Sequence, residues 1–221
     1  MFDNALLLNS FINKIGSLIK EHGASAMITF KNKYRINLSN SNGGIYYLES
    51  GSISIYKKKD DMLLLQVKAP QIVGMFHLWS PNNYYYIRCT DECVFWVATN
   101  EVIRQVISDN NLWYESFCIV ADKVQKLFEH DLKATLNSTQ DIVMAHLKDI
   151  WMLPPSERKN ISIYKYIMIR NHISRSAIYK IVAILINKKV ITIERGCLTY
   201  LETDFFQIID ISNSNSIFKH H

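Results

Sequence analysis

Hydrophobic residues recur at helical spacing at the start of the chain, and a different pattern follows. Residues on one side of the first predicted helix are Leu7, Phe11, Ile15, Leu18 and Ile19, and Gly23 follows its end. Between Ala26 and about Thr99, short runs rich in β-branched and aromatic residues alternate with turn signals such as Ser80-Pro-Asn-Asn. Several short strands at this spacing predict a small barrel or roll.

The segment from residue 161 to residue 201 predicts a helix-turn-helix followed by a β-hairpin. The first helix ends near Arg170, and Ser174 is placed to cap the second. Apolar residues at helical spacing give that second helix one buried stripe, made of Ile178, Ile181, Val182 and Leu185. Two short strands then flank a turn at Arg195-Gly196. Helix, turn, helix and hairpin is the order of a winged DNA-binding domain.

The other face of the second helix carries side chains that can reach phosphates or base edges. The expected DNA contacts are Ser174, Arg175, Ser176, Tyr179, Lys180 and, in the hairpin turn, Arg195. We assign Arg175 the base-reading role, because it lies in the first helical turn and its planar fork suits guanine. Lys180 contacts a base or a phosphate, and Ser174 is expected to donate to a phosphate.

The distribution of charge favours the same segment. The whole chain has a net charge of +5, yet residues 1–155 carry equal numbers of basic and acidic side chains. Residues 156–203 carry nine Lys or Arg against three Asp or Glu. A solvated basic face without a ligand is the alternative, but the coincident helix-turn-helix pattern favours double-stranded DNA as the partner.

A longer run of helical spacing begins near Trp113. Apolar residues there step by 4, 3, 4 and 3 positions: Trp113, Phe117, Val120, Val124 and Leu127. This rhythm is typical of a packed seam and predicts a dimerisation helix over residues 110–137. A core helix lying on its own roll is the alternative. We favour the homodimer, because palindromic operators require a two-fold protein.

Length and composition limit the remaining classes. A chain of 221 residues can form two modest domains, and no apolar run approaches the length of a membrane span. The N-terminus lacks the features of a signal peptide, and the four cysteines show neither zinc spacing nor a C-x-x-C pair. We therefore expect a cytoplasmic protein with reduced thiols and no metal. No nucleophile elbow, P-loop or paired carboxylates are present, so we expect no enzyme.

The order of roll, long helix and winged helix-turn-helix resembles the Crp/Fnr superfamily of bacterial transcription regulators. The resemblance is carried by the stretches Gly44-Ile-Tyr-Tyr-Leu-Glu-Ser-Gly, Ala69-Pro-Gln-Ile-Val-Gly-Met-Phe-His-Leu and Ile173-Ser-Arg-Ser-Ala-Ile-Tyr-Lys. It implies an α+β fold with a cyclic-nucleotide-binding-like roll over 1–109, the dimerisation helix, a winged domain over 138–211 and a tail over 212–221. Asn111-Leu-Trp and Ile173-Ser-Arg-Ser are most similar to an enterobacterial subgroup associated with repressing resistance to hydrogen peroxide.

Departures from the family pattern bear on the ligand. Cyclic-nucleotide-binding members carry Glu after the pocket Gly and an Arg further on, whereas here Met75 follows Gly74 and Asn82-Asn83-Tyr84-Tyr85 stands where the Arg belongs. Without that charged pair a cyclic phosphate loses its main anchor. Iron–sulfur members carry several cysteines near the N-terminus, and none is found here before Cys89. We therefore expect neither cyclic-nucleotide dependence nor a cofactor.

The candidate effector pocket comprises Gly74, Met75, His77, Tyr84, Tyr85 and Arg88. His77 has no identifiable partner ligand for haem, so a packed or surface imidazole is favoured. A group of aromatic residues either lines a small pocket or is buried by strand alternation: Tyr46, Tyr47, Trp79, Tyr84, Tyr85 and Tyr86. Cys89 and Cys93 form a possible redox pair, but the acidic Asp91-Glu92 turn between them would raise their thiol pKa values and reduce reactivity.

These observations predict a homodimeric transcription regulator of the Crp/Fnr type that inserts the helix after Ser174 into the major groove. Ser176 stands where many members carry a base-reading Glu, so the operator should differ from theirs. RNA polymerase is a further candidate partner. The alternative function is a ligand-sensing or protein-interaction roll whose DNA-binding module is vestigial.

Overall fold

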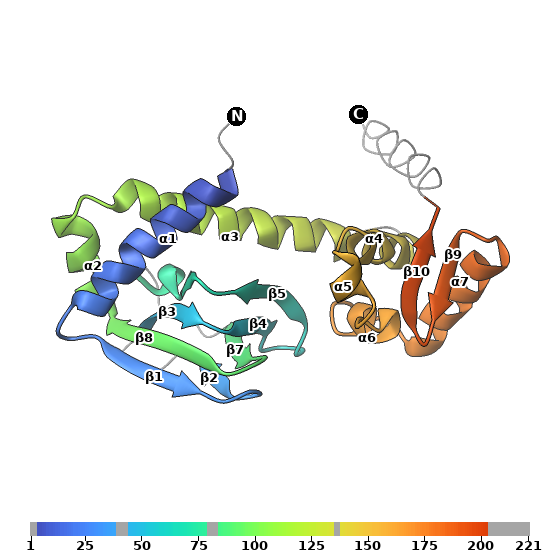
Figure 1. The fold of residues 1–221 in the computed structure, drawn as a ribbon, viewed down its shortest axis with the longest axis horizontal. Coiled ribbons are helices and arrows are strands. Elements are labelled where there is room, and N and C mark those ends of the chain that lie inside the picture. The colour runs from blue at the N-terminus through green and yellow to red at the C-terminus, as the bar shows by residue number, and fades with distance from the viewer. Residues whose placement is uncertain (1–3, 39–43, 79–83, 135–137, 203–221) are drawn as a thin grey trace. The chain divides into compact units, whose positions relative to one another are not determined.

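The computed structural model describes residues 4–38, 44–78, 84–134 and 138–202, and it divides the chain into two units, 1–130 and 131–221 (Figure 1). The expected tail over 212–221 and the candidate pocket residue Trp79 lie outside the described residues. None of the helices within the described ranges is long and apolar enough to cross a membrane.

The first unit is built on two four-stranded antiparallel sheets. The strands of one sheet, in spatial order, are β1 (Ala26–Phe30), β8 (Cys93–Thr99), β3 (Gly44–Ser50) and β6 (Gln71–Val73). The strands of the other are β2 (Arg35–Asn37), β7 (Tyr85–Cys89), β4 (Ser52–Lys57) and β5 (Leu63–Lys68). The roll predicted from the turn spacing is confirmed.

Strand alternation fills the space between the two sheets. Buried residues there include Leu48 and Phe95 from one sheet and Ile53 and Ile87 from the other. Because successive strand residues point to opposite faces, Tyr86 and Arg88 on β7 lie on the face away from Ile87. This alternation decides which candidate pocket residues can reach the interior of the roll.

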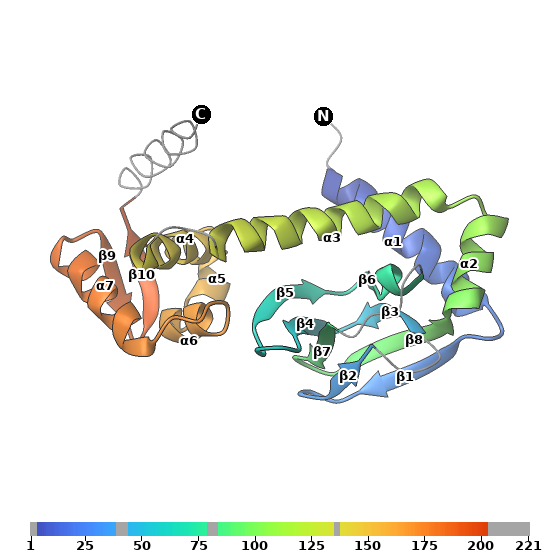
Figure 2. The same cartoon turned by 180° about the vertical axis from the view of Figure 1, so that it is seen from behind.

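Helices cover the outer face of the first sheet (Figure 2). They are α1 (Asn4–Glu21), the 3₁₀ turn η1 (Met75–Leu78), α2 (Asn100–Asp109) and α3 (Trp113–Ala134). Ile15 and Ile19 of α1, Ile103 and Ile107 of α2, and Ile119 of α3 share one buried cluster. One side of the long helix α3 therefore packs on its own roll, and its other side carries exposed apolar side chains such as Phe117 and Phe128.

The second unit consists of helices and a two-stranded hairpin. Its elements are α4 (Thr139–Trp151), α5 (Pro155–Arg158), α6 (Ile163–Met168), α7 (Arg175–Asn187), β9 (Ile191–Glu194) and β10 (Cys197–Leu201). Their shared core includes Leu147, Ile167, Val182 and Leu198. The short helix α5 is not among the elements predicted from the sequence. Pro155 occupies its first turn, where a fixed φ and a missing N–H are no disadvantage.

Candidate DNA-binding site

The second helix of the helix-turn-helix, α7, begins where the sequence predicted. Ser174 is its N-cap, and the Ser174 hydroxyl accepts a hydrogen bond from the backbone N–H of Ala177 at 3.2 Å. The Ser174 oxygen also lies 3.1 Å from the Ser176 hydroxyl. The capping serine thus satisfies one free N–H of the first turn, while the remaining N–H groups and the helix dipole favour an anion at this end.

One face of α7 is buried and the opposite face is exposed. Ile178, Val182 and Leu185 lie in the core of the second unit. The side chains expected to contact DNA on this helix are all exposed: Ser174, Arg175, Ser176, Tyr179 and Lys180. The structure therefore brings these candidates together on a single accessible surface.

Tyr179 is held in place by a neighbour that the sequence did not single out. The rings of Tyr164 on α6 and Tyr179 on α7 stack with centroids 4.2 Å apart and planes at 15°. The Arg175 guanidinium lies 5.6 Å from the centre of the Tyr179 ring. Burial raises the pKa of Tyr164, so its hydroxyl stays neutral. In the sequence, the presence of the aromatic Tyr164 in the first predicted helix is the signal that could have indicated its stacking on Tyr179.

The hairpin turn lies against the start of α6. Arg195 and Gly196 both adopt positive φ, and the backbone N–H of Ile163 donates to the Gly196 carbonyl at 3.0 Å. A glycine suits this position because an L side chain rarely adopts its φ of 81°. Arg195 is exposed at the turn, as expected for a residue that reaches a neighbouring phosphate backbone.

A buried polar contact fixes the connection between α6 and α7. The side-chain amide of Asn171 hydrogen-bonds the imidazole of His146 on α4, and both residues are buried. The second imidazole nitrogen of His146 lies 3.4 Å from the carboxylate of Asp149. His172, next to Asn171 in this connection, does not adopt a positive φ. Asn171 and His146 thus position the turn, and sequence reasoning missed both.

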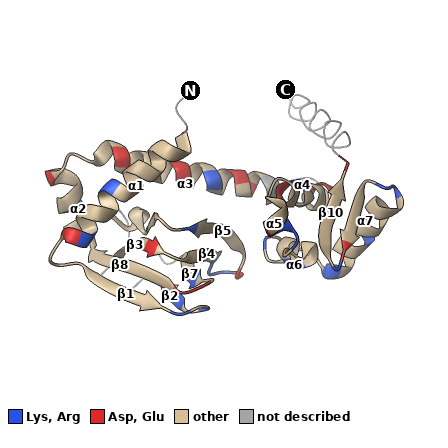
Figure 3. Ribbon diagram, viewed as in Figure 1, with Lys and Arg blue, Asp and Glu red and all other residues tan. Residues whose placement is uncertain are grey.

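Basic residues are distributed over α5, α6, α7 and the hairpin of the second unit (Figure 3). Not all of them are available to a ligand. The Arg158 guanidinium lies 3.8 Å from the centre of the Trp151 ring and donates to the Trp151 carbonyl, and Arg170 lies similarly over Tyr166. The exposed basic side chains among the described residues of the unit are Lys159, Lys165, Arg175, Lys180, Lys188, Lys189 and Arg195. Arg175 and Lys180 are the two of these that belong to α7.

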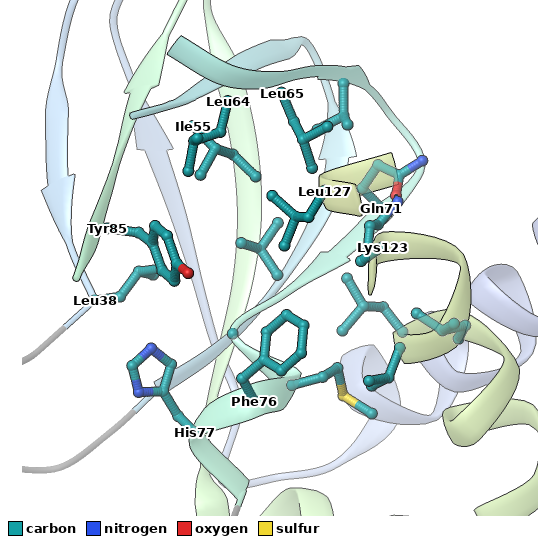
Figure 4. Close-up of a pocket in the computed structure, with 17 residues that line it drawn as sticks. Leu38, Ile55, Leu64, Leu65, Gln71, Phe76, His77, Tyr85, Lys123 and Leu127 are labelled. Atoms are coloured by element: carbon teal, nitrogen blue, oxygen red, sulfur yellow. The ribbon is translucent and has the colours of Figure 1, made fainter. Parts of the chain in front are cut away.

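The candidate effector residues separate into two groups. Gly74, Met75, His77 and Tyr85 line a cavity inside the first unit (Figure 4). Tyr84 is 69% exposed, and Arg88 lies on the outer face of its strand, with its guanidinium 5.3 Å from the Tyr56 ring and 5.7 Å from the Tyr86 ring. The side chain of Arg88 is therefore directed away from the cavity that Tyr85 and His77 line.

Gly74 and His77 take up structural positions at the cavity. Gly74 has a φ of 96°, and a Cβ there would lie 2.9 Å from the carbonyl of Gly44. The backbone N–H of His77 donates to the Gly74 carbonyl, and the His77 carbonyl accepts from Asn100. Burial, followed by the charge of Lys58, lowers the pKa of the His77 imidazole. His77 is thus a buried neutral side chain; across the described residues no three His, Cys, Asp or Glu side chains converge as a metal site would require.

Both cysteines of the considered redox pair are buried. The Cys93 thiol donates to the Ser52 carbonyl at 3.2 Å. Burial raises the pKa of Cys93 to about 12 and, to a smaller extent, the pKa of Cys89. A thiol that stays protonated reacts slowly, because the thiolate is the nucleophile.

The predicted seam residues lie on two faces of α3. Val120 and Leu127 line the cavity of the roll, together with Ile119. The large exposed side chains form a neighbouring stripe: Tyr114 and Phe117 are 68% and 69% exposed, and Phe128 is 65% exposed. Trp113 is half exposed beside them. Of the predicted seam residues, Val120 and Leu127 thus pack on the roll, whereas Trp113 and Phe117 are exposed.

Comparisons with known proteins agree with this architecture. The winged helix-turn-helix DNA-binding family matches residues 139–204. The inhibitor of hydrogen peroxide resistance of Salmonella typhimurium is 23% identical over 186 residues, covering 84% of this chain and 89% of that protein. Its name corresponds to the subgroup that the sequence resembled.

Solved structures give the same result for the fold. The c-di-GMP-responsive global regulator CLP of Xanthomonas campestris superposes with a TM-score of 0.68 at 14% identity, covering 88% of this chain and 99% of that one. A transcriptional regulator of the Crp/Fnr family from Eubacterium rectale gives 0.62 at 12% identity, covering 95% and 98%. The C-terminal segment is therefore a winged helix-turn-helix domain of the DNA-binding class. The whole chain has the fold of the Crp/Fnr transcription regulators.

Proposed function

We propose that the protein is a homodimeric transcription regulator that reads DNA with the exposed face of α7. The observation that supports this most directly is the gathering of Arg175, Ser176 and Lys180 on the accessible face of a capped helix. Arg175 contacts a base edge, Ser174 and Arg195 contact phosphates, and Lys180 contacts either. Such a helix presents its N-terminal residues to the major groove.

Dimerisation is inferred from the outward face of α3. Tyr114, Phe117, Val124 and Phe128 follow one another at steps of 3 or 4 residues with Ala121 between them, which is the spacing of a coiled-coil seam. Tyr114, Phe117 and Phe128 are exposed in a single chain, and a monomer rarely leaves such a stripe uncovered. A second copy of the same helix covers it and places two recognition helices on one operator.

We expect that no cyclic nucleotide regulates the protein. Met75 follows the pocket glycine, and Arg88 stacks outside the roll, so neither supplies the charge that a cyclic phosphate needs. A location in the cytoplasm follows from access to DNA. Contact with RNA polymerase stays a prediction.

Selection of bound sequences from a random DNA pool, using the full chain, tests the function. We expect enrichment of a palindrome whose half-sites are about one helical turn apart. The double variant Arg175→Ala/Lys180→Ala should lose the enrichment, whereas Lys126→Ala on α3 should retain it. If the wild type enriches nothing, the alternative of a sensing roll with a vestigial DNA-binding module replaces the proposal.

A further inference from the structure

The outer face of the second sheet carries a cluster of arginine and tyrosine side chains. Its members come from three adjacent strands: Arg35 from β2, Tyr86 and Arg88 from β7, and Tyr56 from β4. Because strand residues alternate between faces, these side chains lie on the side of the sheet away from Ile87 and the core of the roll. This group is called the arginine–tyrosine cluster below.

The two tyrosine rings of the cluster form a platform for the arginines. Tyr56 and Tyr86 stack with ring centroids 5.2 Å apart and planes at 11°. The Arg35 guanidinium lies 3.6 Å from the centre of the Tyr86 ring, and the Arg88 guanidinium lies 5.3 Å from the centre of the Tyr56 ring. A guanidinium that stacks by its face keeps the N–H groups of its edge for a carboxylate or a phosphate.

Positive charge is concentrated at this cluster without a compensating carboxylate. Arg35 and Arg88 are direct partners in the register of β2 and β7, and like charges placed directly opposite in an antiparallel pair are destabilising. None of the ion pairs between described residues involves either arginine. Asp61 contacts the cluster, but its carboxylate accepts from the Tyr86 hydroxyl at 3.0 Å. An anion bound from outside would relieve the repulsion between the two arginines.

A third cation lies near Arg35. Lys58 follows the end of β4, and its pKa is lowered first by burial and then by the charge of Arg35. The repulsion between Lys58 and Arg35 shows that the two charges are close enough to interact. The face therefore offers positive charge to more than one acidic group of a partner.

The shape and charge of the face limit the class of partner. Small-molecule sites are concave, whereas these side chains lie on the outer face of a sheet. Single-stranded nucleic acids stack their bases on exposed aromatic rings, but Tyr86 is only 1% exposed beneath the arginines. A long polyanion such as duplex DNA favours a surface with excess positive charge, and residues 1–155 carry equal numbers of basic and acidic side chains. A short acidic segment needs positive charge only at the cluster itself.

We propose that the arginine–tyrosine cluster binds an acidic segment of a partner protein, whose carboxylates pair with the guanidinium groups of Arg35 and Arg88. The planar fork of a guanidinium matches a carboxylate with two parallel hydrogen bonds. Arginine and tyrosine are also among the residue types that contribute most to binding at protein interfaces. The site uses no residue of the proposed DNA surface, so it goes beyond the proposed function and does not rest on it.

Fluorescence anisotropy of a labelled oligoglutamate peptide, titrated with the full-length protein, tests the site. The double variant Arg35→Gln/Arg88→Gln should weaken peptide binding at least about tenfold, the loss expected for charged hydrogen bonds. Lys14→Gln/Lys126→Gln is the control of equal charge, because it removes two lysines of the same unit that pair with Glu115 and Asp122. This control should change the affinity less than about twofold.

Two further variants separate the cluster from general effects of charge and stability. Arg35→Lys/Arg88→Lys keeps both charges but loses the planar forks, so it should bind the peptide less tightly than the wild type and more tightly than the Gln variant. Thermal melts should show no loss of stability in the Gln variant, because it removes a repulsion. Should the Gln variant unfold, equal peptide affinity in the Lys variant and the wild type overturns the proposal.

The DNA surface supplies the last comparison. Arg175→Ala/Lys180→Ala should bind the peptide within about twofold of the wild type, and Arg35→Gln/Arg88→Gln should bind random duplex DNA as the wild type does. Equal peptide affinity in the wild type and the Gln variant overturns the proposal, as does a wild type that binds no peptide. Loss of duplex binding in the Gln variant would make the face a DNA contact, and loss of peptide binding in the α7 variant would move the peptide to the DNA surface; either result also overturns it.

Discussion

Tyr164 and Tyr179 join the two helices of the helix-turn-helix by a stacked pair of rings, 4.2 Å between centroids and 15° between planes. Tyr179 comes from the face of α7 that is expected to meet DNA, and Tyr164 comes from α6. The stack leaves Tyr179 46% exposed. It therefore fixes the orientation of a residue at the DNA surface without removing that residue from it.

Removing this stack should affect stability and DNA binding together. Tyr164→Ala should lower the free energy of unfolding by about 1–3 kcal/mol, since an aromatic pair contributes about 0.5–1.5 kcal/mol beyond the area it buries. Tyr164→Phe keeps the ring and should behave as the wild type. Urea unfolding and binding to a selected operator measure the two effects. Equal behaviour of the Ala and Phe variants would contradict a role for the ring.

Arg175→Ala and Lys180→Ala should weaken operator binding in different ways. Loss of a base contact at Arg175 costs about 1–3 kcal/mol and relaxes specificity at one base pair, whereas loss of a phosphate contact weakens all sequences and flattens the salt dependence. Affinities for the operator and for random DNA at several salt concentrations separate the two. Full operator affinity in Arg175→Ala would show that the first turn of α7 does not reach the bases.

Much of the fold could be predicted from the sequence because the decisive signals are local. Ser174 before a helical stripe and Arg195-Gly196 between two strands mark their elements by cap and turn chemistry alone. The inward position of Tyr85 and the outward position of Arg88 could not be assigned, because the register of a strand depends on its partners. The stacking of Tyr164 and the contact of Asn171 with His146 depend on tertiary packing, which no spacing within one helix encodes.

The two faces of α3 illustrate the same limit. Helical spacing identified a packed seam, but Val120 and Leu127 line the roll whereas Phe117 and Phe128 are exposed. A pattern of apolar residues indicates that one face of a helix is covered, but it does not identify the part of the protein, or the partner, that covers it. The prediction therefore treated two adjacent apolar stripes of α3 as a single seam.

Charges on the exposed stripe should dissociate the dimer. Phe117→Asp and Phe128→Asp would each place a carboxylate in a desolvated seam, which is costly. We expect monomers by light scattering and loss of operator binding, with the fold retained by circular dichroism. Gln125→Asp, on the same helix outside the stripe, should remain dimeric. Leu127→Asp should instead lower the melting temperature, because Leu127 lines the cavity of the roll. A stable dimer in both Phe variants would remove α3 as the interface.

Cyclic AMP at millimolar concentration should change neither the melting temperature nor the affinity for DNA. Neither Met75 nor Arg88 is placed to bind its phosphate, and stabilisation by a ligand requires binding to the folded state. Thermal melts with increasing nucleotide provide the measurement. A dose-dependent rise in melting temperature would show that Lys123, which lines the cavity, replaces the missing arginine.

The buried thiols should not act as a peroxide sensor, although a relative is named for hydrogen peroxide resistance. Burial raises the pKa of Cys93 to about 12, so roughly one molecule in 10⁵ carries the thiolate at pH 7. Because folding raises the pKa of the Cys93 thiol, this group lowers the free energy of unfolding only at high pH. The stability is complete below the pKa of the thiol in the unfolded chain and declines as the pH rises above that value.

Mass spectrometry after brief treatment with iodoacetamide or dilute hydrogen peroxide at neutral pH tests this. Cys118 and Cys197, which are partly exposed, should be modified first, and Cys89 and Cys93 should react only on denaturation. Cys93→Ser should retain operator binding with and without peroxide. Rapid oxidation of Cys89 or Cys93 in the folded protein, accompanied by a change in DNA affinity, would establish the redox pair that their burial argues against.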